Sequence, residues 1–160
     1  MCLKFLKRTK KKPDIKKEPG NVTQKIPIGY INTNINVNTN KMQLICDDSD
    51  VNRIILGKYL QRKNCAFVEA SNGLECIDLV NENGIYDIIW MDIQMPKMNG
   101  YDCVKKLRNE LKYDGMIIGV TGYIDKESIE EALSCGMNYI LGKPIDKEVI
   151  FMYVDKYSKV

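Results

Sequence analysis

Five polar side chains stand at the ends of short apolar runs in the sequence. Asp47 and Asp48 come directly after the first run, and Asp92 follows a later one. Thr121 closes the next run, and Lys143 comes shortly after the last. If these runs are parallel strands, the five side chains meet at the sheet edge where such folds bind ligands. Three carboxylates repel one another there, so the sequence predicts a compensating cation.

The chemistry predicted for this group is phosphoryl transfer. The oxygen ligands favour Mg²⁺ over zinc, and Mg²⁺ usually combines one or two carboxylates with water and phosphate oxygens. The Asp92 carboxylate can act as a nucleophile that forms an acyl phosphate. Lys143 and the metal would neutralise charge on the transferred group, and the Thr121 hydroxyl would donate a hydrogen bond to it. Taken singly, the Asp47-Asp48 pair fits helix capping, Thr121 fits ordinary strand propensity and Lys143-Pro144 fits a surface turn. Their order at successive strand ends favours a functional site instead.

Apolar runs alternate with amphipathic stretches from Met42 onward, which predicts five strand and helix units. Such alternation indicates an α/β fold, a five-stranded parallel sheet with helices on both faces. The spacing i, i+3, i+4 and i+8 marks the first helix, at Val51, Ile54, Ile55 and Tyr59. In the second helix we expect three side chains to point inward, Leu74, Ile77 and Val80. The predicted strands are 42–46, 66–70, 87–91, 116–121 and 138–141, and the later helices are 73–81, a stretch through 104–111, 126–134 and 146–157.

The net charge of +3 over 160 residues conceals an uneven distribution. Residues 1–20 have a net charge of +6, and residues 21–41 add two lysines, so residues 42–160 carry −5. Five asparagines lie within residues 32–40. We therefore expect residues 1–41 to be a basic, Asn-rich, disordered tail or linker, although the alternation there could form a short edge strand. The predicted folded domain is 42–160.

Histidine is absent from the sequence, which excludes Ser-His-Asp triads, His-ligated zinc and a phosphorylated histidine in this chain. The six cysteines form no Cys-x-x-Cys pair, which argues against zinc ribbons and thioredoxin-like sites. Several lie in apolar runs, and we interpret them as buried thiols in a reducing compartment. No stretch has the pattern of a signal peptide or the length of a transmembrane helix, so we expect a cytoplasmic protein.

Four segments resemble the receiver domain of two-component response regulators, particularly receivers attached to hybrid sensor kinases. The most specific is Met91-Asp-Ile-Gln-Met-Pro-Lys-Met-Asn-Gly100, which looks like the phosphoacceptor loop of that family. The resemblance covers roughly residues 42–157. It implies a flavodoxin-like fold and a phosphorelay signalling function, with no enzyme activity beyond phosphotransfer to itself and slow dephosphorylation. The supporting segments are residues 46–53, 120–122 and 136–145.

By this resemblance, Asp92 accepts a phosphoryl group from a phosphohistidine on another protein, a histidine kinase or a histidine phosphotransfer protein. Thr121 and Lys143 would contact the phosphoryl group, and Pro144 would follow a cis peptide bond. Only one closing helix fits after Lys143, so we expect output through partner proteins or onward phosphate transfer. Mg²⁺ would be held by Asp47, Asp48, Asp92 and the backbone carbonyl of Gln94.

Four positions bear on how such a receiver would switch. The family usually has Tyr or Phe three residues before the lysine, where this sequence has Ile140. Tyr139 lies one residue earlier, but neighbouring strand residues face opposite ways, so Tyr139 is no simple replacement. Gln94 and Tyr123 occupy positions that in the family tune how fast the aspartyl phosphate hydrolyses.

Two other functions compete with this interpretation. One is an aspartate-nucleophile phosphatase of the haloacid dehalogenase type, whose second Asp acts as acid and base; here that position is Gln94, which cannot do so. The other is a receiver-fold binding module that does not switch and works through the surface of its fourth helix. We expect a standalone protein from Met1 and the distinctive tail, and a piece of a longer hybrid kinase is the alternative.

The basic tail has two main interpretations, a solvated disordered segment and a segment that contacts a membrane surface. Cys2 lies beside apolar residues and a run of lysines, a combination that suits S-acylation with electrostatic attraction to a membrane surface. Peripheral membrane association through residues 1–20 is therefore one expectation. No aromatic interleaving accompanies the lysines, and nucleic acid is not an expected partner of the domain.

Overall fold

The structure is a computed structural model that describes residues 38–158, with side chains from Met42 onward. The expectations about the tail, including Cys2 and membrane contact through residues 1–20, lie outside the described residues. Within residues 38–158, no helix is long and apolar enough to cross a membrane.

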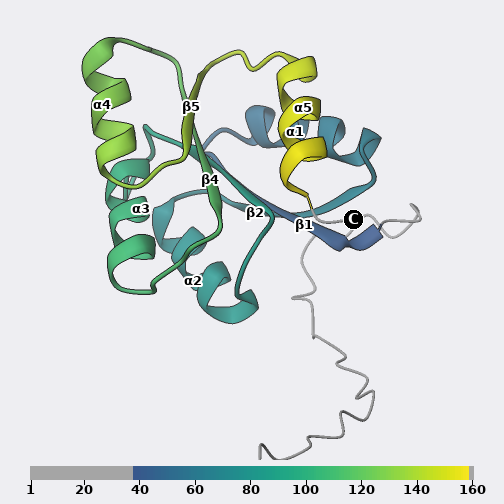
Figure 1. Cartoon of the computed structure of the whole chain (residues 1–160), viewed down its shortest axis with the longest axis horizontal. Coiled ribbons are helices and arrows are strands. Elements are labelled where there is room, and N and C mark those ends of the chain that lie inside the picture. The colour runs from purple at the N-terminus through teal and green to yellow at the C-terminus, as the bar shows by residue number, and fades with distance from the viewer. Residues whose placement is uncertain (1–37, 159–160) are drawn as a thin grey trace, which may run out of the picture.

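Strands and helices alternate along this part of the chain, as the sequence predicts (Figure 1). Neighbouring strands all pair in parallel, in the order β2-β1-β3-β4-β5, and the predicted five-stranded parallel sheet is confirmed. The strands are β1 (Asn38–Cys46), β2 (Cys65–Ala70), β3 (Ile88–Asp92), β4 (Met116–Thr121) and β5 (Tyr139–Gly142). The helices are α1 (Asp50–Arg62), α2 (Gly73–Asn83), α3 (Gly100–Asn109), α4 (Lys126–Ser134) and α5 (Lys147–Tyr157). Thus β1 begins four residues before the predicted strand, at Asn38, which pairs with Cys65 across a shift in register.

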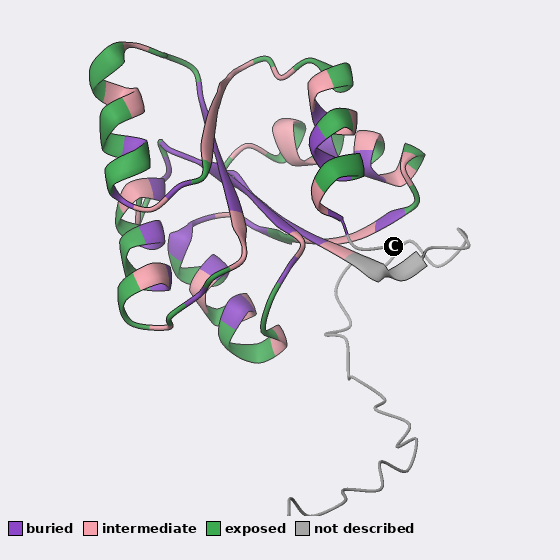
Figure 2. Cartoon of the chain, in the orientation of Figure 1, coloured by how far each residue is buried: buried purple, intermediate pink, exposed green. Residues whose placement is uncertain are grey.

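Helices cover both faces of the sheet, with α1 and α5 on one face and α2, α3 and α4 on the other (Figure 1). Each face has its own hydrophobic core. The core under α1 and α5 includes Leu60 and Trp90, and the core on the opposite face includes Ile89 and Leu107. Because β3 lies between the two cores, all of its residues are buried (Figure 2), which explains why its sequence is apolar without alternation.

The strand order brings the ends of β1 and β3 side by side at the centre of the sheet. Cys46 pairs with Met91, so the residues that follow them, Asp47 and Asp92, lie on neighbouring strands. The chain then turns directly into α1, whose N-cap Ser49 accepts a hydrogen bond from the backbone N–H of Asn52. This edge is the switch point of the topology, where open parallel sheets bind their ligands.

In α1 and α2, the buried face differs from the one that the spacing of apolar residues predicts. The residues whose spacing predicts α1 are largely exposed: Val51 is 63%, Ile54 53% and Ile55 47% exposed. The helix instead packs through its other side, where a Cβ on Gly57 would come within 2.6 Å of the Phe67 ring, so α1 lies close to the sheet. In α2, Val80 is buried and Ile77 partly buried, but the expected inward position of Leu74 is wrong because it is 45% exposed and Cys76 is buried instead. Both helices have apolar residues on two sides, and periodicity alone does not choose between them.

Candidate functional site

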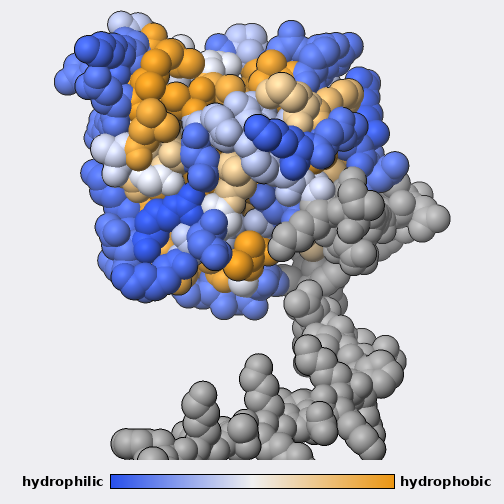
Figure 3. All heavy atoms as spheres, in the orientation of Figure 1, coloured by the Kyte–Doolittle hydropathy of each residue, from blue (hydrophilic) through white to orange (hydrophobic). Residues whose placement is uncertain are grey.

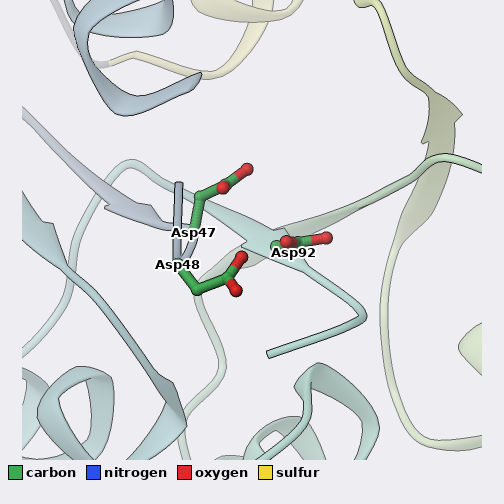
Figure 4. A group of neighbouring side chains, drawn as sticks. All are labelled: Asp47, Asp48 and Asp92. Carbon is green, nitrogen blue, oxygen red and sulfur yellow. The ribbon is translucent and has the colours of Figure 1, made fainter. Parts of the chain in front are cut away.

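Asp47, Asp48 and Asp92 lie together at the carboxyl edge of the sheet. Each offers a carboxylate oxygen, and these oxygens lie within 4.8 Å of one another (Figure 4). Asp47 and Asp92 are buried, whereas Asp48 is exposed to solvent. The donor set consists of carboxylate oxygens with one side open to water, which fits a hard cation such as Mg²⁺ better than zinc.

The Asp47 carboxylate is fixed by the first turn of α1. The backbone N–H of Ser49 donates to Oδ1 at 2.9 Å, and the side-chain amide of Asn52 donates to Oδ1 and Oδ2 at 3.0 and 3.2 Å. The Arg53 guanidinium donates to the Asp47 backbone carbonyl at 2.7 Å. Asn52 was not among the predicted site residues; the signal that could have found it is its position one helical turn after the acidic pair.

Lys143 bridges the two buried carboxylates. Its Nζ lies 2.8 Å from Oδ2 of Asp47 and 3.0 Å from Oδ2 of Asp92. Burial lowers the pKa of Lys143, but the hydrogen bonds to both carboxylates outweigh this effect and raise its pKa above the ordinary lysine value. Lys143 thus stays protonated and offsets part of the negative charge of the cluster.

The environment of Asp92 disfavours its ionised form. Burial is the main cause that raises the pKa of Asp92; the hydrogen bond from Lys143 opposes the rise, and the negative charge of Asp47 adds to it. The backbone N–H of Gln94 lies 3.4 Å from Oδ1 of Asp92, while the Gln94 side chain is exposed. A buried and poorly solvated carboxylate in this position is well placed to bond to an incoming electrophile.

We expect Asp92→Asn to raise the melting temperature of the metal-free domain at neutral pH. Because the folded-state pKa of Asp92 is raised, its ionisation costs folding free energy once the pH exceeds that pKa, and costs nothing below the pKa of the unfolded chain. The difference between variant and wild type should therefore disappear as the pH falls toward ordinary aspartate values. Circular dichroism melts in EDTA across this pH range measure it, and a variant less stable than wild type at pH 7 would contradict it.

Thr121 ends β4 next to Asp92, but its hydroxyl is engaged by the loop that follows. Val120 pairs with Asp92 across the sheet, which places Thr121 one residue beyond it. The Thr121 hydroxyl donates to the carbonyl of Tyr123 at 3.1 Å and accepts from the Tyr123 N–H at 3.3 Å. The Tyr123 side chain itself is exposed. A contact between Thr121 and a phosphoryl group therefore requires the hydroxyl to leave this turn.

The end of β5 is tied to the same edge of the sheet. The Lys143–Pro144 peptide bond is cis. The backbone N–H of Lys143 donates to the carbonyl of Thr121 at 2.7 Å, so the lysine enters the site from the strand next to Thr121. The five predicted chemical groups thus come from the ends of four consecutive strands of the sheet, β1, β3, β4 and β5.

Comparison with known families identifies this arrangement. A family model described as response regulator receiver domain matches residues 44–155, most of the chain. The chain belongs to the response-regulator receiver family. The matched range includes the acidic cluster, Thr121 and Lys143. The sequence predicts a receiver in phosphorelay signalling, and the family match confirms this prediction.

Relatives of this receiver domain occur in large kinases and in small regulators. The osmosensing histidine protein kinase SLN1 of Saccharomyces cerevisiae is 35% identical over 109 residues, which are 65% of this chain and 9% of that protein. Two-component response regulator 24 of Arabidopsis thaliana is 37% identical over 102 residues, 64% of this chain and 73% of that protein. The chain spans less than a tenth of SLN1 and of two hybrid histidine kinases from Dictyostelium discoideum that it also matches.

Solved structures of other receivers share the fold. The chemotaxis protein CheY4 of Vibrio cholerae aligns with a TM-score of 0.68 at 25% identity, covering 73% of this chain and 98% of that one. A chain from the co-crystal structure of the Saccharomyces cerevisiae histidine phosphotransfer protein Ypd1 and the receiver domain of Ssk1 gives the same TM-score and identity, covering 74% and 88%. The flavodoxin-like receiver fold is therefore confirmed.

The two candidate switch residues of this receiver domain lie on opposite faces of β5. Tyr139 packs toward α5, where its ring centroid lies 5.0 Å from that of Tyr153 and its hydroxyl lies 2.7 Å from that of Tyr157. Ile140 packs against the core on the other face of the sheet. The Tyr139 ring thus lies on the opposite face of the sheet from Ile140, which occupies the position where the family usually has Tyr or Phe.

Gly100 supports the loop that follows Asp92. It begins α3, and its backbone N–H donates to the carbonyl of Ile93 at 2.9 Å. A Cβ at this position would lie 2.2 Å from the carbonyl oxygen of Asp92, so only glycine lets α3 approach the strand end this closely. Gly100 closes the sequence motif that resembles a phosphoacceptor loop, and its structural role becomes visible only in the packing.

Proposed function

We propose that Asp92 accepts a phosphoryl group from a phosphohistidine on another protein. In this reaction a carboxylate oxygen of Asp92 bonds to phosphorus, the P–N bond breaks, and the electron pair stays on the imidazole nitrogen. The observation that carries the proposal is the position of Asp92: a buried carboxylate between a protonated Lys143 and an acidic pair that suits a metal. Such a site can stabilise the negative charge on a transferred phosphoryl group.

Lys143 has the central electrostatic role in this proposal. Its Nζ bridges Asp47 and Asp92, so a phosphoryl group arriving at Asp92 comes within reach of the same ammonium. Thr121 would donate its hydroxyl to a phosphoryl oxygen once it releases the carbonyl of Tyr123. This exchange links phosphorylation to the β4–α4 loop, whose exposed Tyr123 a partner can contact.

The residues that would hold Mg²⁺ are carboxylates already close together. Asp48 is exposed and free to coordinate, whereas Asp47 and Asp92 are buried beside it. When bound, Mg²⁺ supplies positive charge against the phosphoryl oxygens. We propose Asp47, Asp48, Asp92 and the carbonyl of Gln94 as its protein ligands, with water completing the shell.

The phosphoryl donor is proposed to be a histidine kinase or a histidine phosphotransfer protein in the cytoplasm. Residues 1–160 contain no histidine, so the donor residue must lie outside this sequence. The co-crystal of Ypd1 with the Ssk1 receiver supports this kind of partner, since that receiver shares the fold.

A specific observation favours the second candidate, a receiver-fold module that binds partners without switching. Hydrophobic surface runs beside α4 in Figure 3, and Leu133 on this helix is 52% exposed. Ile124, in the loop before α4, is exposed as well. Ile140 has no aromatic ring, whereas the family usually has Tyr or Phe at this switch position. A phosphatase gains no support, because Gln94 lacks an acidic group.

We expect acetyl phosphate with Mg²⁺ to modify wild-type protein at a single site, and Asp48→Asn to need about tenfold more Mg²⁺ for half-maximal modification. Intact-protein mass spectrometry measures the added phosphoryl group, with EDTA as the control for metal. Asp102→Asn, an exposed aspartate on α3, is the matched variant and should behave like wild type. Modification that proceeds equally well in EDTA would contradict the metal assignment, and no modification at all would favour the non-switching module.

A further inference from the structure

A cavity of about 470 Å³ opens from the phosphorylation site and runs between α1 and the β5–α5 region. One end is polar and contains Asp47, Asn52, Asp92 and Lys143. This size falls within the range of small-molecule sites, and such sites combine mostly apolar walls with a few polar groups that fix orientation.

The rest of the cavity is apolar. Its two side walls come from α1 and from the β5–α5 connection with α5, and Ile45 and Val120 of the sheet also line it. An edge-to-face contact between Tyr59 and Phe151, with ring centroids 6.4 Å apart, joins the two helices. The apolar wall residues are Ile55, Leu56 and Tyr59 on one side and Pro144, Ile145 and Ile150 on the other.

Charge indicates how a ligand would be oriented. Asp47 and Asp92 outweigh Lys143 at the polar end, so without a cation an anionic group is repelled. A divalent cation among the three aspartates reverses this balance and favours a phosphoryl group near Lys143. The apolar walls then face whatever group the phosphoryl is attached to, and burying that group would add to the binding free energy.

We infer that this cavity binds the apolar part of a small phosphoryl donor, an acyl phosphate whose acyl group is aromatic or branched aliphatic. The inference rests on the proposed function and deepens it by naming the leaving group. A carboxylate oxygen of Asp92 bonds to phosphorus, and the bond between phosphorus and the acyl oxygen breaks. The electron pair leaves with the acyl carboxylate, so no added proton or electron is needed.

The first test measures binding apart from reaction. Phenylphosphonate and methylphosphonate are titrated into the full chain with Mg²⁺ by isothermal calorimetry. We expect phenylphosphonate to bind about tenfold more tightly, because its ring is buried against the cavity walls. Equal affinities would overturn the inference, whatever Asp92 does with acetyl phosphate.

The second test compares reaction rates in matched variants. Wild type should be phosphorylated about tenfold faster by benzoyl phosphate than by acetyl phosphate at low concentrations, as measured by mass spectrometry. Ile55→Trp, which fills the cavity, should remove this preference, and Ile54→Trp on the same helix should keep it. Ile55 and Ile54 are 47% and 53% exposed, so both variants should fold.

The outcomes separate the two proposals. A preference that persists in Ile55→Trp would overturn the cavity assignment while leaving Asp92 as phosphoacceptor. If neither acyl phosphate modifies Asp92, the cavity has no role in phosphoryl transfer, and transfer from a phosphohistidine protein tests the proposed function separately.

Discussion

Replacing Lys143 with methionine is expected to destabilise the metal-free domain by about 3 kcal/mol, because it leaves two buried carboxylates without their cation. Lys143 makes ion pairs of 2.8 and 3.0 Å to Asp47 and Asp92, and both partners are buried. The same substitution should slow phosphorylation of Asp92 by about 100-fold or more, since a charge that stabilises the transferred group is lost.

Urea unfolding in EDTA measures the stability loss, and intact mass after incubation with acetyl phosphate measures the rate. Lys147→Met is the matched control, because Lys147 is half exposed on α5 and, within residues 38–158, forms an ion pair only with its neighbour Glu148. Its effect on stability should stay within about 0.5 kcal/mol. Adding Mg²⁺ should restore much of the stability of Lys143→Met. Equal stability of the Lys143 and Lys147 variants in EDTA would show that the lysine does not compensate the cluster.

Gly100→Ala is expected to cost about 3 kcal/mol of folding free energy, because the added methyl group overlaps backbone that cannot move freely. The Cβ would lie 2.2 Å from the carbonyl oxygen of Asp92 and 3.0 Å from the Cα of Ile93. Relief of this overlap must displace either the start of α3 or the phosphoacceptor loop. We therefore also expect slower phosphorylation in the fraction that remains folded.

Gly122→Ala provides the comparison at the end of the neighbouring strand. An added Cβ at Gly122 meets no atom within 4 Å, so this variant should have nearly wild-type stability. Thermal melts and phosphorylation rates of both variants test the argument. A Gly100→Ala protein as stable and as reactive as Gly122→Ala would mean that α3 does not need its close approach to Asp92.

The fold could be predicted from the sequence because one rule decides it: strands and helices that alternate strictly build a parallel sheet. The same rule places the residues that follow β1 and β3 at one edge, so Asp47, Asp48 and Asp92 could be brought together without coordinates. Lys143 follows from the same argument, although its ion pair with Asp47 spans 96 residues of sequence.

Features that depend on helix rotation or loop conformation could not be predicted in this way. The apolar spacing of α1 fits two faces, and the buried one is chosen by the approach of Gly57 to Phe67. The amide of Asn52 reaches Asp47 only because the first turn of α1 folds over the carboxylate. The hydroxyl of Thr121 is turned toward Tyr123, an orientation set by the loop rather than by the residue type.

The proposed acceptance of a phosphoryl group by Asp92 from a phosphohistidine can be measured in a single experiment. A radiolabelled phosphohistidine protein is mixed with the full chain and Mg²⁺, and wild type and Asp92→Asn are compared side by side. We expect label to move to wild type within the time course, and we expect Asp92→Asn, although folded, to take up none. Equal labelling of Asp92→Asn and wild type would place the phosphoacceptor elsewhere and contradict the proposed role of Asp92.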